Sequence, residues 1–156
     1  MKIAVEWHKR ASPHEFEFQG STERGLVTEI GARSSAEGPQ SAASPKELVA
    51  FGMASCTGID VVSTLQKMRQ PLTDFSVSCD IEQTDSHPRV FKSCLMTYHV
   101  TGAGLDHGRV AHAVGLSLHK YCGVSAMIER SGCIVTSVLL VNGMPIEIES
   151  RNAEEL

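Results

Sequence analysis

The sequence predicts an α+β fold in which antiparallel sheets surround one long central helix. Three observations lead to this prediction. Short segments near the N-terminus alternate between apolar and polar residues, residues 44–69 have the start signal and apolar surface of a buried helix, and two strands, a helix and more strands follow. The chain has 156 residues and no internal repeat. We therefore expect one domain spanning residues 1–156.

Three short segments near the N-terminus alternate between apolar and polar residues, as half-buried strands do. These segments are residues 3–7, 16–18 and 26–30. Turn-forming residues separate them at 11–14 and 20–25, which predicts a three-strand meander. Small and polar residues from 32 to 43 then predict a loop.

Residues 44–69 predict the long helix around which the rest of the chain is arranged. Ser44, Pro45 and Glu47 form a capping box, in which Ser44 is the N-cap, Pro45 takes the first helical position and Glu47 reaches back to the cap amide. Pro71 marks the end of the helix. Because most of the helix circumference is apolar, we expect it to be buried on several sides.

The rest of the chain predicts a second sheet with its helical cover. The evidence is alternation in the strands, an apolar stripe at spacing four in the longer helix, and a hairpin signal at Asn142-Gly143. The predicted elements are strands 75–82 and 90–101, helices 105–121 and 124–130, and strands 133–141 and 146–149.

The composition is that of an ordinary soluble globular protein, with 42% apolar and 21% charged residues. A net charge of -4 provides no electrostatic basis for binding nucleic acid. Glu6 interrupts the N-terminal segment, which lacks the apolar core of a signal peptide. No apolar run approaches the roughly 20 residues that a bilayer requires. We expect a cytoplasmic protein that binds neither nucleic acid nor membranes.

Five cysteines are the residues most relevant to chemistry, and they lie at positions 56, 79, 94, 122 and 133. In a reducing compartment any disulfide is expected to be transient and catalytic. The sequence has no C-x-x-C pair, and its seven histidines form no paired ligand motif. It therefore predicts no metal site and no cofactor. Cys79, Cys94 and Cys133 are predicted to be buried packing residues.

Cys56 and Cys122 differ from the others because both lie on predicted helices beside small residues. Lowering a thiol pKa from about 8.5 to about 6 requires about 3.4 kcal/mol of preferential thiolate stabilisation. Cys56 is too far from its helix start to gain this from the helix dipole, and Asp60, one turn further on the same face, opposes it. A helix restarting after Gly123 would instead favour a thiolate at Cys122. From the residues alone, packing and redox roles both stay open.

Two stretches, S-P-K-E-L-V-A-F-G-M-A-S-C and H-K-Y-C-G-V-S-A-M, resemble the OsmC/Ohr family of osmotically inducible and organic-hydroperoxide-resistance proteins. The resemblance runs from about Ser44 to Asn142. It implies an intertwined α+β homodimer with the long helix at its centre and active sites at the subunit interface. It also implies a thiol peroxidase that takes part in the response to oxidative stress. In such an enzyme Cys56 would attack an organic hydroperoxide and become a sulfenic acid, and Cys122 would resolve this acid by forming a disulfide. A dithiol, such as a lipoylated protein, would reduce that disulfide.

The chain departs from the peroxide-reducing branch of the family at the groups around the first cysteine. That branch has a glutamate directly after the helix-starting proline, where this chain has Lys46. Glu47 is one residue further along and is interpreted as the capping-box partner. The family arginine lies in a Gly-Gly-Arg turn that is absent here. Arg24 beside Gly25, and Arg33, are the nearest substitutes, and the alternative for either is a solvated side chain without a role in the site. The chain therefore resembles a less characterised OsmC-like branch.

Lys120, close to Cys122 in the sequence, is another candidate cation for the site, although an exposed helix lysine is the preferred interpretation. The sequence therefore leaves open whether the chain is an enzyme, and three hypotheses remain. The first is a thiol peroxidase that uses Cys56 and Cys122. The alternative is a non-catalytic dimer that binds an apolar small molecule or senses redox state with weak or no peroxidase activity. A disulfide-exchange protein is a third.

Overall fold

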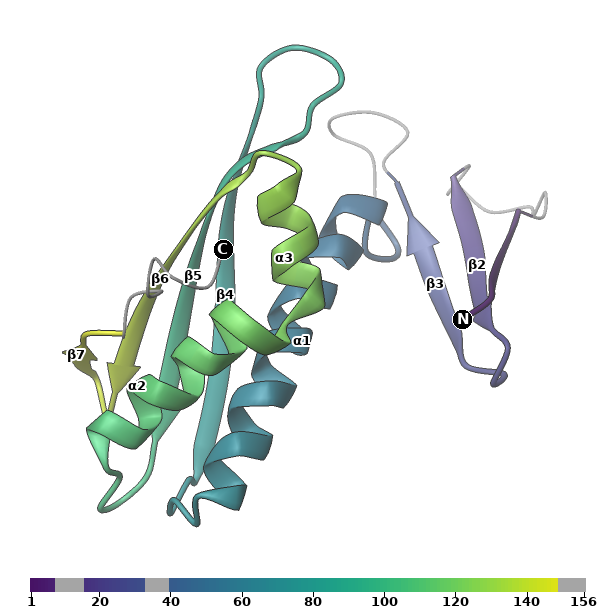
Figure 1. Ribbon diagram of the computed structural model, residues 1–156. Coiled ribbons are helices and arrows are strands. Elements are labelled where there is room, and N and C mark those ends of the chain that lie inside the picture. The colour runs from purple at the N-terminus through teal and green to yellow at the C-terminus, as the bar shows by residue number, and fades with distance from the viewer. Residues whose placement is uncertain (8–15, 33–39, 149–156) are drawn as a thin grey trace. The chain divides into compact units, whose positions relative to one another are not determined.

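The computed structural model shows an α+β chain of two compact units, Met1–Phe51 and Gly52–Leu156 (Figure 1). The described residues are 1–7, 16–32 and 40–148. Helix α1 (Pro45–Lys67) begins in the first unit and continues into the second. A single domain over the whole chain therefore stays a prediction.

Three expectations lie wholly or partly outside the described residues. They are the turn at 11–14, most of the loop at 32–43, and residue 149 at the end of the last predicted strand.

The first unit contains the predicted meander of β1 (Ile3–Trp7), β2 (Glu17–Thr22) and β3 (Val27–Gly31), which pair antiparallel in that order. The turn was predicted over residues 20–25, but it begins only after residue 22. Residues 20 to 22 belong to β2, because their backbone still pairs with neighbouring strands. The chain reverses after them, with Gly25 at a φ of 77°.

The start of α1 confirms the capping box. The backbone N–H and the hydroxyl of Ser44 both donate to Glu47 Oε2 at 2.7 Å, and the Glu47 N–H donates to Ser44 Oγ at 3.4 Å. These bonds satisfy backbone donors that a helix start leaves without intrahelical partners. Glu47 therefore has the structural role that the sequence predicts.

The second unit is built on a four-stranded sheet in the order β4 (Asp74–Gln83), β5 (Phe91–Thr101), β6 (Ile134–Val141) and β7 (Met144–Ile146). Among the described strands, the pairings are antiparallel as predicted except for β5 with β6, which is parallel. The helices between these two strands form a crossover, which returns the chain in the same direction. The β6–β7 hairpin turns at Asn142 and Gly143, both with positive φ.

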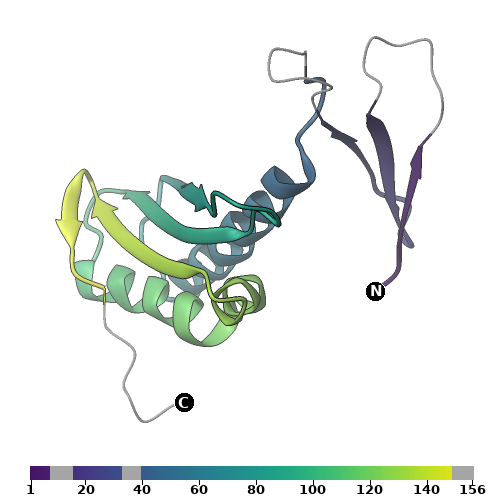
Figure 2. The same cartoon turned by 90° about the horizontal axis from the view of Figure 1, so that it is seen from above.

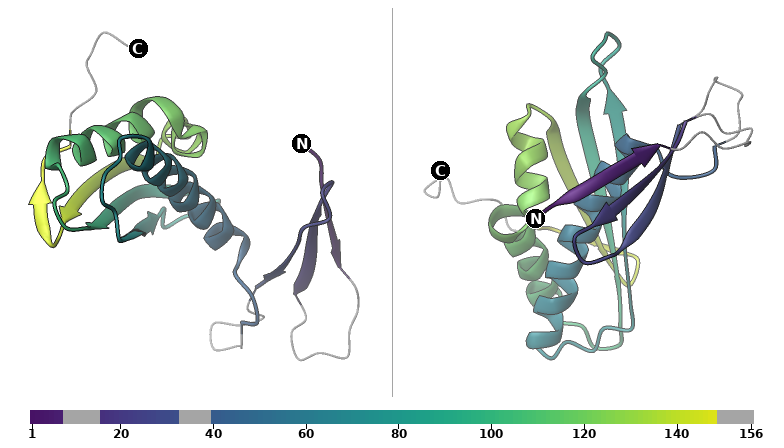
Figure 3. Two further views of the ribbon diagram at one scale, coloured as in Figure 1. Left: turned by 90° about the horizontal axis from the view of Figure 1, so that it is seen from below. Right: turned by 90° about the vertical axis from the view of Figure 1, so that its right-hand side faces the viewer.

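Three helices cover one face of this sheet (Figures 2 and 3). They are α1, α2 (His107–Leu116) and α3 (Gly123–Arg130). The helix predicted over 105–121 ends its α-helical part at Leu116 and continues as a π-helical turn over Ser117–Tyr121. The core between helices and sheet contains Met53, Val61 and Leu65 from α1, Val110, Ala113 and Val114 from α2, and Met96, Tyr98, Val100, Leu139 and Val141 from the strands.

Helix α1 is buried along one stripe only. Its buried residues are Met53, Thr57, Val61 and Leu65, each one turn apart. Ile59 on another side is 69% exposed. The expectation of burial on several sides is therefore not met within one chain, and an apolar helix surface is left uncovered.

By length and composition, α1 is also long and apolar enough to cross a membrane. The expectation that no segment would be long and apolar enough to cross a membrane was wrong. Glycine, serine and threonine interrupt the apolar run of α1 without adding charge. The core helix of a soluble protein passes the same test. The absence of a membrane partner stays a prediction.

Candidate functional site

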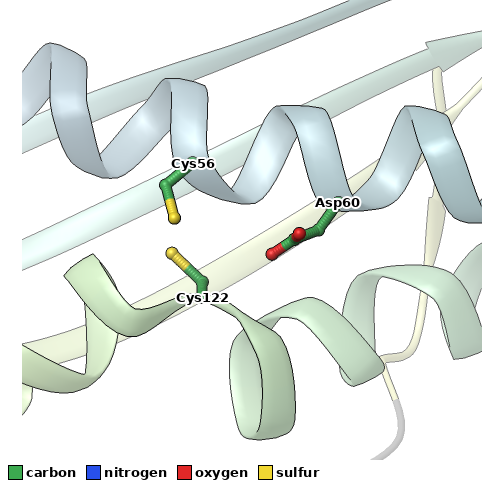
Figure 4. Close-up of side chains that lie close together, drawn as sticks. All are labelled: Cys56, Asp60 and Cys122. Atoms are coloured by element: carbon green, nitrogen blue, oxygen red, sulfur yellow. The ribbon is translucent and has the colours of Figure 1, made fainter.

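Helix α1 places Cys56 and Asp60 one turn apart, facing Cys122 at the start of α3 (Figure 4). The two Sγ atoms and a carboxylate oxygen of Asp60 all lie within 4.8 Å of one another. The two sulfurs point toward each other, and the carboxylate turns toward the same space. The structure therefore brings together the two cysteines that the sequence singled out.

Cys122 lies between the π-helical turn and α3, where the helical backbone is interrupted. It has an extended backbone, with φ −73° and ψ 96°, and it is the N-cap of α3. The backbone N–H and the hydroxyl of Ser125 donate to Cys122 Sγ at 3.4 and 3.1 Å. The prediction that a helix restarts here is confirmed, with Gly123 as its first residue.

The pKa of Cys56 is raised above its ordinary value, first by burial and then by its hydrogen bond with Cys122. The backbone N–H of Val124 acts in the opposite direction, while the charge of Asp60 raises the pKa further. Among the described residues, no cationic side chain contributes to this shift. The expected opposition between Asp60 and a thiolate is thus confirmed, and the groups around Cys56 favour its protonated form.

A buried chain of hydroxyl groups holds Asp60. Its Oδ2 accepts a hydrogen bond from Ser117 Oγ at 3.2 Å. Ser117 Oγ lies 2.8 Å from Thr57 Oγ1, which lies 2.9 Å from the Tyr98 hydroxyl. Thr57, Ser117 and Tyr98 are all 0% exposed. These hydroxyls satisfy one another inside the core and link α1 to β5 and to the π-helical turn.

Sequence reasoning missed this network. A signal was present, because Thr57 lies in the buried stripe of α1 between Met53 and Val61. A hydroxyl at such a position requires a partner in the core.

Residues 38–138 match the family model described as OsmC-like protein. The chain belongs to this family. It is 41% identical over 100 residues to Protein YhfA of Escherichia coli strain K12, a match covering 64% of this chain and 75% of YhfA.

Solved structures agree with the OsmC-like fold. A chain from structural genomics has a TM-score of 0.76 and 33% identity, covering 90% of this chain and 98% of its own. The organic hydroperoxide resistance protein OhrB of Bacillus subtilis has a TM-score of 0.56 and 20% identity, covering 88% and 96%. The second likeness supports the fold alone. The α+β prediction and the family resemblance are confirmed.

Three other residues that the sequence proposed for the site belong to the first compact unit of this OsmC-like protein. Glu47 is engaged in the capping box. Lys46 is exposed on the first turn of α1, and Arg24 is exposed in the turn between β2 and β3. Support of Cys56 by any of the three stays a prediction. Arg33, the other arginine proposed for the site, lies outside the described residues.

Lys120 lies near the site in sequence, but its ammonium group is 5.9 Å from the centre of the Tyr121 ring. This is a cation–π distance at an exposed position. Tyr121 and Asp60 also line an open cavity of about 610 Å³, together with Ser63, Lys67 and Leu116. Asp60 thus connects the thiol pair with a hollow on the surface of the second unit.

The remaining cysteines lie in or beside the core of the OsmC-like fold. Cys94 and Cys133 are buried, and Cys79 is half-buried. The packing prediction therefore fits all three. The thiols of Cys79 and Cys94 lie on neighbouring strands, and the Cys79 thiol raises the pKa of Cys94. Sequence reasoning did not predict this second thiol pair.

Proposed function

We propose that this protein reduces organic hydroperoxides with Cys56 as the peroxidatic thiol and Cys122 as the resolving thiol. One observation carries the proposal: the two sulfurs face each other within 4.8 Å. Membership of the OsmC-like family supports it. So does the fold that the chain shares with a protein of organic hydroperoxide resistance. A role in resistance to oxidative stress would follow.

The reaction would proceed in three balanced steps. The Cys56 thiolate attacks the O–O bond of ROOH, forming Cys56–SOH and an alkoxide that takes a proton from water to become ROH. The Cys122 thiol then attacks the sulfenic sulfur, forming the Cys56–Cys122 disulfide and releasing water. A dithiol, such as a lipoylated protein, exchanges with this disulfide and is oxidised while both cysteines regain protons.

The local geometry suits the second step. A disulfide requires an S–S distance of about 2.05 Å, so sulfurs that lie within 4.8 Å of each other must approach by at most about 2.7 Å. The donors from Val124 and Ser125 orient the sulfurs from the α3 side. They also replace water around a developing negative charge on sulfur.

We further propose that the protein acts as a cytoplasmic homodimer. One chain leaves large apolar side chains exposed along α1, namely Val49, Phe51 and Ile59. Such surfaces mark interaction sites in soluble proteins. A second copy covering α1 would account for the apolar surface that one chain leaves open. It could also supply a cation to Cys56, with Arg24 and Lys46 as candidates.

The test is to treat fully reduced protein with one equivalent of cumene hydroperoxide and to map the cysteines by mass spectrometry. The proposal expects two thiols lost per chain, a linked Cys56–Cys122 peptide, and catalytic consumption once a dithiol is added. Cys56→Ser should abolish consumption, and Cys122→Ser should accumulate a sulfenic acid. Cys79→Ser is the matched control and should behave like wild type. Free thiols at both positions after treatment would overturn the proposal.

A second candidate function is a non-catalytic dimer that binds an apolar molecule or responds slowly to oxidants. Asp60 beside Cys56 favours this candidate, as does Lys46 at the position of the glutamate of the peroxide-reducing branch. It expects a disulfide that forms only with excess hydroperoxide over many minutes. Disulfide exchange without hydroperoxide consumption would instead indicate the third hypothesis.

A further inference from the structure

We propose that the reduced protein binds one zinc ion per chain through Cys56, Cys122 and Asp60. The three side chains offer two sulfurs and a carboxylate oxygen, and these atoms all lie within 4.8 Å of one another. They come from two different segments that converge on one point (Figure 4). The proposal concerns the same side chains as the peroxidase proposal but does not depend on it.

The separations suit a zinc ion after a small adjustment. Zinc lies about 2.3 Å from thiolate sulfur and about 2.0–2.2 Å from carboxylate oxygen, so ligand atoms around a tetrahedral ion are roughly 3.5–4 Å apart. Atoms within 4.8 Å of one another need to contract by at most about 1.3 Å to reach this spacing. Side-chain rotation can supply that without moving α1 or α3.

The ligand types also select the ion. Two thiolates are soft ligands that zinc accepts and that magnesium and calcium do not. With three protein ligands, a tetrahedral zinc ion has a fourth position left for water. Binding releases the two thiol protons to the solvent, because cysteine coordinates as a thiolate.

A second observation is independent of the ligand distances: hydrogen-bond donors already hold two of the three ligand groups. Ser117 Oγ donates to Asp60, and Ser125 donates twice to Cys122. Ser117 and Ser125 are both 0% exposed. Metal sites in proteins commonly orient their ligands through such outer contacts.

The negative charge of Asp60 has a role in binding a cation but no evident role in peroxide reduction. A carboxylate beside a thiol opposes ionisation of that thiol, which is a disadvantage for a nucleophile. A divalent cation between them reverses the effect, because the two thiolates and the carboxylate then share it. Sulfurs joined in a disulfide cannot act as thiolate ligands. Zinc binding and Cys56–Cys122 disulfide formation therefore exclude each other.

The test uses the 156-residue chain, reduced and kept anaerobic, with no hydroperoxide present. Zinc is titrated in competition with a chromophoric chelator, and cobalt(II) serves as a spectroscopic substitute. The proposal expects one zinc per chain and a sulfur-to-cobalt charge-transfer band with tetrahedral d–d absorption. Cys56→Ser and Cys122→Ser should each remove the intense band, and Asp60→Asn should weaken zinc binding at least about tenfold. Cys79→Ser should change none of these.

Three results would overturn the proposal: binding of much less than one equivalent, binding that survives loss of Cys56 or Cys122, and unchanged affinity in Asp60→Asn. A measurement on wild-type protein excludes the explanation that the variants lose zinc binding because they misfold. Protein alkylated at Cys56 and Cys122 with iodoacetamide should bind no zinc, and retained binding would also contradict the proposal. A chain that binds zinc but does not turn over hydroperoxide would refute only the peroxidase proposal, and the reverse result only this one.

Discussion

Asp60 lies one turn after Cys56 on α1, and its carboxylate lies within 4.8 Å of the Cys56 sulfur. The hydroxyl of Ser117 holds that carboxylate, and the buried contacts of Ser117 with Thr57 extend the network into the core. A negative charge is therefore built into the surroundings of the thiol that the family resemblance assigns as nucleophile. The effect of this charge can be measured.

Asp60→Asn should increase the reactivity of Cys56. The substitution keeps the side-chain size but removes a charge that raises the Cys56 pKa. A lower pKa means more thiolate at neutral pH, so alkylation of the Cys56 peptide by iodoacetamide should accelerate roughly threefold to tenfold. Mass spectrometry of that peptide over time gives the rate. Asp85→Asn, in the exposed β4–β5 loop, is the control and should leave the rate unchanged. An equal or slower rate in Asp60→Asn would contradict the assigned effect.

The reaction of Cys56 with a hydroperoxide should depend steeply on pH. Burial and the contact with Cys122 raise the Cys56 pKa, so its thiolate is the minor form near neutral pH. Below the pKa the thiolate fraction grows about tenfold per pH unit, and the rate of Cys56 oxidation should grow with it. Stopped-flow measurements of thiol loss between mildly acidic and mildly alkaline pH give the profile. A rate that is already flat at neutral pH would contradict the raised pKa of Cys56.

Thr57→Val should destabilise the second unit. Valine has the shape of threonine but lacks the hydroxyl that lies between Tyr98 and Ser117. Both partners are fully buried, so the loss should lower the free energy of unfolding by about 1–3 kcal/mol. Urea denaturation at one fixed protein concentration measures the difference. Thr101→Val at the exposed end of β5 should change stability by less than about 0.5 kcal/mol. Equal stability of the two variants would show that the network contributes little.

Sequence patterns predicted most elements, because periodicity reports which residues of a segment face the core. The strands and the start of α1 follow from alternation and from the Ser44–Glu47 cap. The parallel pairing of β5 with β6 could not be predicted this way, since alternation is the same for both strand directions. The π-helical turn at Ser117–Tyr121 was also missed, because an apolar stripe does not report the hydrogen-bonding pattern of one turn.

The site was only partly predictable. The nearness of Cys56 and Cys122 came from the family resemblance, since no spacing rule joins a helix to a segment so far along the chain. The donors from Val124 and Ser125 depend on where α3 begins to within one residue. The grouping of Asp60 with both sulfurs required the packing of α1 against the start of α3.

Ile59→Glu should disrupt the proposed homodimer without unfolding the chain. Ile59 is 69% exposed on α1, so a charge there costs a single chain little. If a second copy covers this helix, the same charge is buried without a partner and opposes association. Analytical ultracentrifugation should show wild type as a dimer and the variant mainly as a monomer, with unchanged far-UV circular dichroism. Ser86→Glu, in the exposed β4–β5 loop, should remain dimeric. A monomeric wild type would refute the homodimer, and a dimeric Ile59→Glu would place the interface away from this part of α1.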